Sequence, residues 1–222
     1  MTRCDPPIPD ADRKIVSGEW WGTTTTAAFL NHASPSRATS DEDFMLRTMV
    51  SLASHLGTRP GETAALRWSD RRGDVIHISR SRSLSGWQVV EKAPKTENGI
   101  RDIPVTSAVA SLWTGLRDRQ TVTPLDGYLM SVDGEVLHPA KLSEAFRDLQ
   151  ETFLPSHPDA RKLKFYDVRH VGLSAMLRAG VPLHTVSRLA GHSDQHFTFN
   201  VYGEIVPEDL SDAGEKMEGQ YG

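Results

Sequence analysis

The most constraining feature of this sequence is a change in the spacing of its hydrophobic residues. Apolar residues recur at helical spacing across 41–56, and Ser40 with Asp43 has the spacing of a capping box at the start of that segment. Between residues 75 and 105 the pattern becomes short runs of β-branched and aromatic residues, and helical spacing returns after residue 106. The sequence therefore predicts an α+β fold that is mostly helical, with a small three-stranded antiparallel sheet near its start.

The same patterns set the expected bounds of each element. Gly86 and Asn98-Gly99 lie at expected turns, Gly180 ends one helix and Pro182 opens the next. The expected elements are helices at 27–30 (capped by residues 23–26), 41–56, 62–67, 107–117, 140–151, 167–179 and 182–190, and strands at 75–78, 87–90 and 103–105.

The composition is that of an ordinary folded protein with one large domain or two small ones. The chain has 222 residues, of which 38% are hydrophobic and 24% are charged. Its single cysteine, Cys4, can form no intramolecular disulfide and cannot build a cysteine-based metal site. No apolar run approaches the ~20 residues that cross a bilayer, and the first residues lack a signal-peptide pattern. We therefore expect a cytoplasmic protein that does not associate with a membrane.

Acidic residues gather at the C-terminal end, which changes the meaning of the net charge of −4. Residues 203–222 carry six acidic residues against one lysine, so the rest of the chain is close to neutral. Basic residues gather at 59–102 and 161–164, where a local face toward nucleic acid can form. The expected organisation is a proline-rich linker or arm at 1–18, a folded domain at 19–206 and an acidic tail at 207–222.

Four polar segments stand out, and each taken alone has a simple structural explanation. Arg59 lies in a Gly/Pro turn with a glutamate three residues later, the spacing of a surface ion pair. Lys95 falls at an expected hairpin, where a lysine usually aids solubility. Arg169 lies at the start of an expected helix, and His192 next to a glycine is followed ten residues later by Tyr202. A lone histidine or tyrosine in such a place usually caps or packs.

Together these residue types match the needs of phosphoryl transfer to a tyrosine. Two arginines can clamp the non-bridging oxygens of a phosphate, and a histidine adds a third donor. A lysine can protonate an alkoxide leaving group while a tyrosine hydroxyl attacks phosphorus and forms a phosphoester. This set requires no metal, and the sequence contains no HExxH motif, Walker glycine loop or GxGxxG motif. We therefore expect neither a metal nor a cofactor.

The order of the four segments resembles the catalytic domain of the tyrosine recombinase (phage integrase) family over roughly residues 40–210. The strings that carry the resemblance are GTRPGE followed by LRWSD, then PKTENGIRDIPV, then YDVRH, and finally LAGHSD with a tyrosine beyond it. They resemble the family's first arginine box, its β-hairpin lysine segment, its HxxR box and its final histidine and tyrosine. The resemblance implies a site-specific recombinase that cleaves and rejoins DNA through a 3′-phosphotyrosine intermediate, as the catalytic domain of a phage or mobile-element integrase.

The resemblance also assigns catalytic roles to five residues. Arg59 and Arg169 would clamp the phosphate, and Lys95 would be the general acid on the 5′-hydroxyl leaving group. His192 would donate to the phosphate and orient the nucleophile, which would be Tyr202.

Three further residues depart from or support this set. Tyr166 takes the catalytic position where the family usually has the histidine of HxxR, and its hydroxyl can still donate a hydrogen bond. Glu62 occupies the family's acidic support position, and we expect His170 to make structural hydrogen bonds at a helix start. The expected DNA contacts come from Arg59, Lys95, Arg101, Lys162, Lys164 and Arg169.

The resemblance implies partners as well. In the family, four protomers assemble on two double-stranded DNA attachment sites, so we expect a monomer that forms a tetramer on DNA, with accessory DNA-bending or directionality proteins. A full integrase has a helical core-binding domain before the catalytic domain, so we expect either an excised catalytic domain or the product of a short gene. The acidic tail, with an expected short helix at 208–217, resembles the family's C-terminal segment that packs on a neighbouring protomer.

Three alternatives remain open on the sequence. Residues 175–194 resemble a helix-turn-helix, as in a transcriptional regulator, but this interpretation leaves Arg59, Lys95 and Tyr202 unexplained. Type IB topoisomerases use the same kind of site to nick and reseal DNA. A decayed integrase would bind DNA without cutting it.

Overall fold

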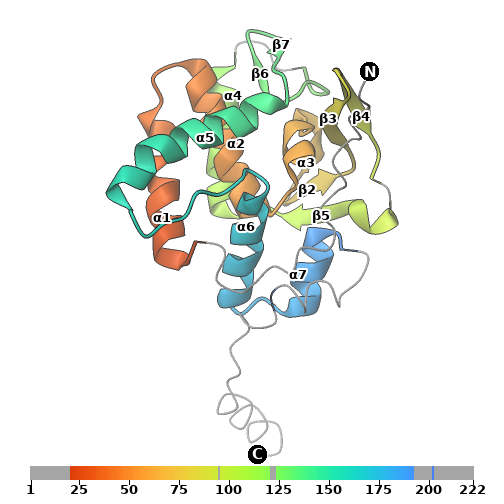
Figure 1. The fold of residues 1–222 in the computed structure, drawn as a ribbon. Coiled ribbons are helices and arrows are strands. Elements are labelled where there is room, and N and C mark those ends of the chain that lie inside the picture. The colour runs from red at the N-terminus through yellow and green to blue at the C-terminus, as the bar shows by residue number, and fades with distance from the viewer. Residues whose placement is uncertain (1–20, 95, 121–123, 193–201, 203–222) are drawn as a thin grey trace, which may run out of the picture.

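Helix α2 (Asp41–Leu56) forms the centre of the fold in the computed structural model of the chain (Figure 1). The structure describes residues 21–94, 96–120, 124–192 and 202. Within this part α2 packs against α4 (Ser107–Arg119), α5 (Ala140–Phe153) and α6 (Asp167–Arg178). The other helices described are α1 (Thr23–His32), α3 (Pro60–Ala64) and α7 (Leu183–Ala190), with 3₁₀ turns at Pro35–Arg37, Trp68–Asp70, Glu97–Gly99 and Leu154–Ser156.

The ends of α2 follow directly from local sequence. The Ser40 hydroxyl accepts a hydrogen bond from the backbone N–H of Asp43 at 3.1 Å, which satisfies one of the free donors of the first turn. At the other end Gly57 adopts a left-handed conformation with φ of +60°, which glycine reaches without steric cost. The expected helix bounds of 41–56 are confirmed.

The strands in the described part of the chain form three small antiparallel sheets. The first pairs β1 (Arg71–Arg72) with β2 (Val75–Ile78) and β2 with β5 (Arg101–Pro104), so that Ile76 lies opposite Ile103. The second is a ribbon of β3 (Ser81–Ser85) and β4 (Gln88–Lys92), and the third pairs β6 (Ser131–Val132) with β7 (Glu135–Val136). A small three-stranded antiparallel sheet is therefore present, in an otherwise mostly helical α+β fold, as expected.

One expected strand was assigned to the wrong sheet. The segment 87–90 does not join 75–78 and 103–105; β4 pairs instead with β3 in the separate ribbon. β3 was missed because its sequence, SRSLS, contains a single apolar residue and gives no alternating pattern. The ribbon is largely exposed, so burial does not impose that pattern on it.

The helices after residue 106 agree with the sequence to within two residues. The expected 107–117 is α4, 140–151 is α5, 167–179 is α6 and 182–190 is α7. The short helix expected at 62–67 begins and ends earlier, at Pro60–Ala64, because proline is favoured at the first helical position. The division into a linker at 1–18, a domain at 19–206 and a tail at 207–222 stays a prediction, because both termini and the helix expected at 208–217 lie outside the described residues.

Among the residues that the structure describes, two hydrophobic clusters hold the helices together. In the larger one Trp21, Phe29, Phe146 and Phe153 tie α1 to α5, with ring centroids 4.7 to 6.3 Å apart. The smaller cluster joins α6 to α7 and consists of Leu173, Leu177, Val186, Ala190 and Tyr202. The second cluster matters for function because it contains the expected nucleophile.

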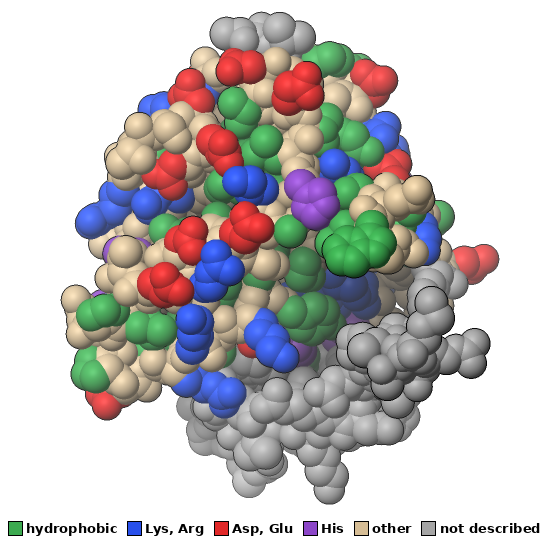
Figure 2. All heavy atoms as spheres, turned by 45° about the horizontal axis from the view of Figure 1, so that its top comes forward, with side chains coloured by type: hydrophobic (Ala, Val, Ile, Leu, Met, Phe, Trp, Pro, Cys, Tyr) green, Lys and Arg blue, Asp and Glu red, His purple; other side chains and the backbone are tan. Residues whose placement is uncertain are grey.

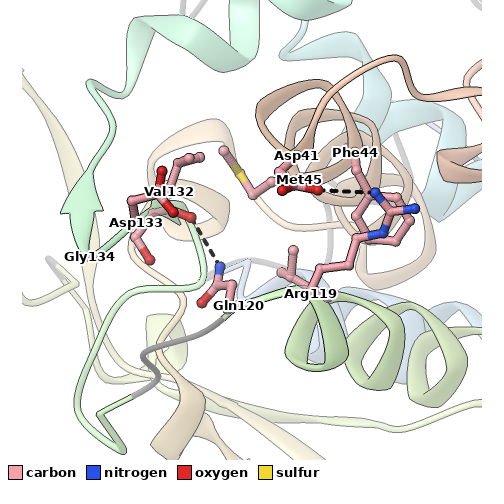
Figure 3. A pocket seen from close by; sticks show the side chains of 10 residues that line it. Asp41, Phe44, Met45, Arg119, Gln120, Val132, Asp133 and Gly134 are labelled. Carbon is pink, nitrogen blue, oxygen red and sulfur yellow. Dashed lines mark hydrogen bonds and ion pairs between the residues drawn. The ribbon is translucent and has the colours of Figure 1, made fainter.

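The face in Figure 2 carries basic and acidic side chains interspersed with one another. A small pocket opens between α2, α4 and the β6–β7 turn (Figure 3), where Arg119 lies over the ring of Phe44 and donates to Asp41 at 3.1 Å. Among the described residues, no helix combines the length and apolarity that crossing a membrane requires.

Candidate active site

Three arginines from three elements converge on one buried carboxylate. Glu62 lies in α3 and is 4% exposed. Arg59 precedes α3, Arg101 lies in β5 and Arg169 lies in the first turn of α6. The sequence predicted Arg59 and Arg169 together with Glu62, and the structure places the three side chains in one cluster.

The link between Arg59 and Glu62 is local. One Glu62 carboxylate oxygen accepts the backbone N–H of Arg59 at 2.8 Å, and the other accepts its guanidinium at 2.8 Å. Pro60 at the first helical position needs no N–H partner, so the RPGE string starts a helix and folds its glutamate back onto its arginine. The Arg59 side chain is 36% exposed, which leaves it accessible from solvent.

The link between Arg101 and Glu62 joins distant parts of the chain. The Arg101 guanidinium donates to both Glu62 oxygens, at 3.1 and 2.8 Å, in the two-pronged geometry that suits a carboxylate. Along β5, burial alternates, so that Arg101 lies on the same buried side as Ile103. That alternation was a signal in the sequence that Arg101 points inward.

Arg169 is 1% exposed and is held by the ends of two helices. It donates to the carbonyl of Gly57, after α2, at 2.9 Å, and to the carbonyl of Ala190, in α7, at 2.6 Å. Helix C-terminal carbonyls carry partial negative charge and lack partners within the helix, so they suit a buried cation. Burial, with the charge of Arg59, lowers the pKa of Arg169 to about 10, and the guanidinium stays protonated at neutral pH.

The C-terminus of α7 contacts all three arginines. Successive carbonyls there accept hydrogen bonds: that of Leu189 from Arg101 at 2.5 Å, that of Ala190 from Arg169 at 2.6 Å and that of Gly191 from Arg59 at 3.4 Å. Gly191 has φ of +67°, and a Cβ there would approach the Asn98 carbonyl to 2.7 Å. The pair α6–α7, whose residues 175–190 the sequence also suggested as part of a DNA-reading helix-turn-helix, thus contributes Arg169 and three carbonyls to the arginine cluster.

The charges of the cluster do not cancel. Burial would raise the pKa of Glu62, but hydrogen bonds and charge from Arg101, with Arg59, outweigh it and lower that pKa to about 2. Glu62 is therefore ionised at neutral pH and offsets one of three guanidinium charges. The surplus positive charge of these four groups suits an anion such as a phosphate diester.

His192 follows Gly191 and joins the cluster through its ring. Its Nε2 lies 2.9 Å from the Arg169 guanidinium, and because arginine can only donate, Nε2 accepts. Burial, followed by the charges of Arg169 and Arg59, lowers the pKa of His192 to about 3, so the ring is neutral. The proton of the neutral ring then lies on Nδ1.

The expected nucleophile, Tyr202, lies between α6 and α7. Its ring packs in the smaller hydrophobic cluster and is 0% exposed. Its hydroxyl is 2.5 Å from Nδ1 of His170, which is itself buried. His170 was expected to make structural hydrogen bonds at a helix start, and the sequence did not indicate its partner.

Four other expected site residues lie apart from the cluster or outside the described residues. Tyr166 is 46% exposed, with its ring centroid 5.5 Å from that of His170. Lys162 and Lys164 are exposed before α6, and the Lys162 ammonium lies 3.8 Å from a Glu151 carboxylate oxygen. Lys95 lies outside the described residues.

The DNA contacts expected from the sequence stay predictions. The guanidinium of Arg101 makes hydrogen bonds inside the protein: it donates to the Glu62 carboxylate and to the carbonyls of Leu189 and Gly99. Among the described residues, no group of three or more histidine, cysteine or acidic side chains has the arrangement of a metal site.

The sequence of this chain is similar to a known protein family and to two relatives in it. The family model described as the phage integrase family matches residues 25–208. A XerC-like tyrosine recombinase of Caldanaerobacter subterraneus subsp. tengcongensis is 27% identical over 190 residues, which cover 78% of this chain and 49% of that protein. The ICEBs1 integrase of Bacillus subtilis (strain 168) is 21% identical over 183 residues, covering 80% of this chain and 50% of the integrase.

Among solved structures, the Tn1549 transposon integrase in complex with circular intermediate DNA has the same fold. It superposes with a TM-score of 0.72 at 19% identity, covering 92% of this chain and 68% of the integrase. The chain spans about half the length of the two relatives matched by sequence. Because the family model covers most of its residues, the chain belongs to the phage integrase family.

Proposed function

We propose that this chain is the catalytic part of a site-specific DNA recombinase that cleaves and rejoins DNA strands through a covalent 3′-phosphotyrosine. The observation that carries the proposal is the convergence of Arg59 and Arg169 on the buried Glu62, with the ring of His192 against Arg169. This cluster combines surplus positive charge with fixed donors, as the transition state of phosphoryl transfer requires. The matched relatives are a tyrosine recombinase and an integrase, and the Tn1549 integrase structure contains DNA.

In the proposed reaction the scissile phosphate binds against Arg59 and Arg169. The Tyr202 hydroxyl gives up its proton to a base as its oxygen attacks phosphorus, the bond from phosphorus to the 5′-oxygen breaks, and Lys95 gives a proton to the departing 5′-oxygen. The phosphotyrosine conserves the energy of the broken bond, so a 5′-hydroxyl can reverse the step and rejoin strands. The proposed partners are double-stranded attachment sites, on which monomers assemble into a tetramer, and accessory proteins that bend DNA or set direction.

The test is covalent capture on a nicked suicide substrate that carries a candidate attachment site, followed by denaturing electrophoresis. The wild type should give a DNA-linked band, and Tyr202→Phe should give none. Tyr128→Phe is the matched control, because this tyrosine contacts Arg67 and Glu91 instead of the cluster.

Replacing Arg169 should slow capture without abolishing DNA binding. Arg169→Ala removes one fixed donor to the transition state, so we expect a loss of roughly 10²–10³-fold in cleavage rate. Near-normal cleavage by Arg169→Ala would exclude the proposed clamp. Tetramer formation on paired sites separates the recombinase from a topoisomerase-like enzyme, and DNA binding without any covalent band supports a regulator or a decayed integrase instead.

A further inference from the structure

The hydrogen bond between His170 and Tyr202 places an imidazole next to the hydroxyl of the proposed nucleophile. Nδ1 of His170 lies 2.5 Å from the Tyr202 hydroxyl oxygen, the atom that would attack phosphorus. Both side chains are buried, with His170 4% and Tyr202 0% exposed. An imidazole nitrogen at this distance can take the proton that the hydroxyl must lose.

The structure also fixes the imidazole relative to the phosphate clamp. His170 follows Arg169 directly in α6, and Arg169 is anchored to the carbonyls of Gly57 and Ala190. The Tyr202 ring is held in the cluster that joins α6 to α7. The base, the nucleophile and Arg169 of the clamp are therefore positioned by the same two helices, α6 and α7.

Tyr202 needs a proton acceptor more than an exposed tyrosine does. An unperturbed phenol has a pKa of about 10, so roughly one in a thousand is ionised at pH 7. Burial raises the pKa of Tyr202 further, beyond the ordinary range of tyrosine. A free phenolate is correspondingly rarer, and attack is favoured only if the proton leaves as the bond to phosphorus forms.

His170 is in the protonation state that this task requires. Burial, with the positive charge of Arg169, lowers its pKa to about 4, so the imidazole is neutral at pH 7 and can accept a proton. Tyr166, which takes the place of the usual histidine of HxxR, has no imidazole nitrogen to accept a proton, and its ring centroid lies 5.5 Å from that of His170. The imidazole of His170 contacts the Tyr202 hydroxyl directly.

We propose that His170 is the general base for strand cleavage, an inference that rests on the proposed function. As the Tyr202 oxygen forms its bond to phosphorus, its O–H bond breaks and the proton passes to Nδ1 of His170. The bond from phosphorus to the 5′-oxygen breaks, and that oxygen takes a proton from Lys95. In the rejoining step the attacking 5′-hydroxyl gives its proton to the neutral Lys95 amine, and the imidazolium of His170 returns its proton to the departing Tyr202 oxygen.

Bound DNA would strengthen this base. Within the described part of the chain, the charged and titratable groups near His170 include Arg169 and Tyr166 of α6, Tyr202, and His192 beyond α7. A phosphate diester bound at Arg169 offsets the positive charge that disfavours protonation of His170. Proton transfer from Tyr202 thus becomes easier when substrate is in place.

The test compares single-turnover cleavage of the suicide substrate by the wild type and His170→Asn. The asparagine oxygen can occupy the place of Nδ1 and accept a hydrogen bond, but it cannot take up the proton. We expect cleavage to slow roughly 10²–10³-fold, within the range for loss of a general base. His184→Asn, on the exposed side of α7, is the matched control.

A pH series separates a base from a structural residue. In His170→Asn only the ionised tyrosine reacts, so its rate should rise roughly tenfold per pH unit between pH 7 and 9, while the wild-type rate changes much less. If His170→Asn does not fold, as judged by urea unfolding, His170→Gln replaces it.

Two results would overturn the inference alone, given a covalent band in the wild type that Tyr202→Phe lacks. One is a variant that cleaves within threefold of the wild type or faster, which would make His170 a restraint on the tyrosine. The other is a slow variant whose pH dependence parallels that of the wild type. Absence of a covalent band in the wild type would instead overturn the proposed function itself.

Discussion

Two regions of this protein pair an arginine with a carboxylate at similar distance and in very different surroundings. In the arginine cluster, Arg101 donates to Glu62 at 2.8 Å, and the two side chains are 5% and 4% exposed. Beside the pocket of Figure 3, Arg119 donates to Asp41 at 3.1 Å, and these side chains are 49% and 71% exposed. Arg119 also lies over the Phe44 ring, 4.1 Å from its centroid.

The difference teaches that burial, more than distance, decides what such a pair does. The exposed pair can exchange its partner for water, so it contributes little to stability. The buried pair cannot, so removing one partner leaves a charge without compensation. The arginine cluster therefore fixes the geometry of the site and holds surplus positive charge where it can bind a phosphate.

Glu62→Gln should have the largest effect. The amide removes the negative charge and turns an N–H₂ group toward guanidinium donors, so we expect a loss of about 3–5 kcal/mol in the free energy of unfolding. Urea unfolding of Glu62→Gln and of Asp41→Asn, each against the wild type, compares their losses in the free energy of unfolding. Equal losses in the two variants would contradict the comparison.

A fall from pH 7 to pH 5 should have an intermediate effect. Burial and the charge of Arg169 lower the pKa of His170 to about 4 and that of His192 to about 3. Below about pH 6.5 the two histidines bind protons in the unfolded chain but stay neutral in the folded protein. By pH 5 each histidine therefore lowers the free energy of unfolding by on the order of 1–2 kcal/mol. Glu62, with its pKa lowered to about 2, adds its own loss only below about pH 4.5.

Urea unfolding at the two pH values, on the wild type and His170→Gln, measures this effect. His170→Gln should lose less stability between pH 7 and 5 than the wild type, because one titrating group is gone. His184→Gln is the control on the exposed side of α7. Identical pH dependence in the wild type and His170→Gln would contradict the assignment of His170 as a buried neutral base.

Asp41→Asn should have the smallest effect. An exposed pair is worth about 0–1 kcal/mol, and at 1 M salt, where the screening length is about 3 Å, the difference from the wild type should vanish. Unfolding at low and high salt checks this, with Glu62→Gln expected to keep most of its loss at both. A loss from Asp41→Asn that resists salt would show that the pocket pair is also insulated from solvent.

Local sequence predicted most of the fold. The cap at Ser40 and the glycine at 57 set the bounds of α2, and helical spacing located the helices after residue 106. Strand pairing was predicted less well, because β3 has no apolar alternation and its pairing with β4 depends on the whole ribbon.

The candidate site divides in the same way. Sequence alone determined which residue types the site contains. It also determined the contact between Arg59 and Glu62, because a spacing of three residues at the start of a helix brings the two side chains together. Tertiary structure decided the contact of Glu62 with Arg101, 39 residues away, and that of His170 with Tyr202, 32 residues away. The physical reason is that a capping contact needs only local backbone geometry, whereas these two contacts exist only after α6, α7 and β5 have packed and excluded water.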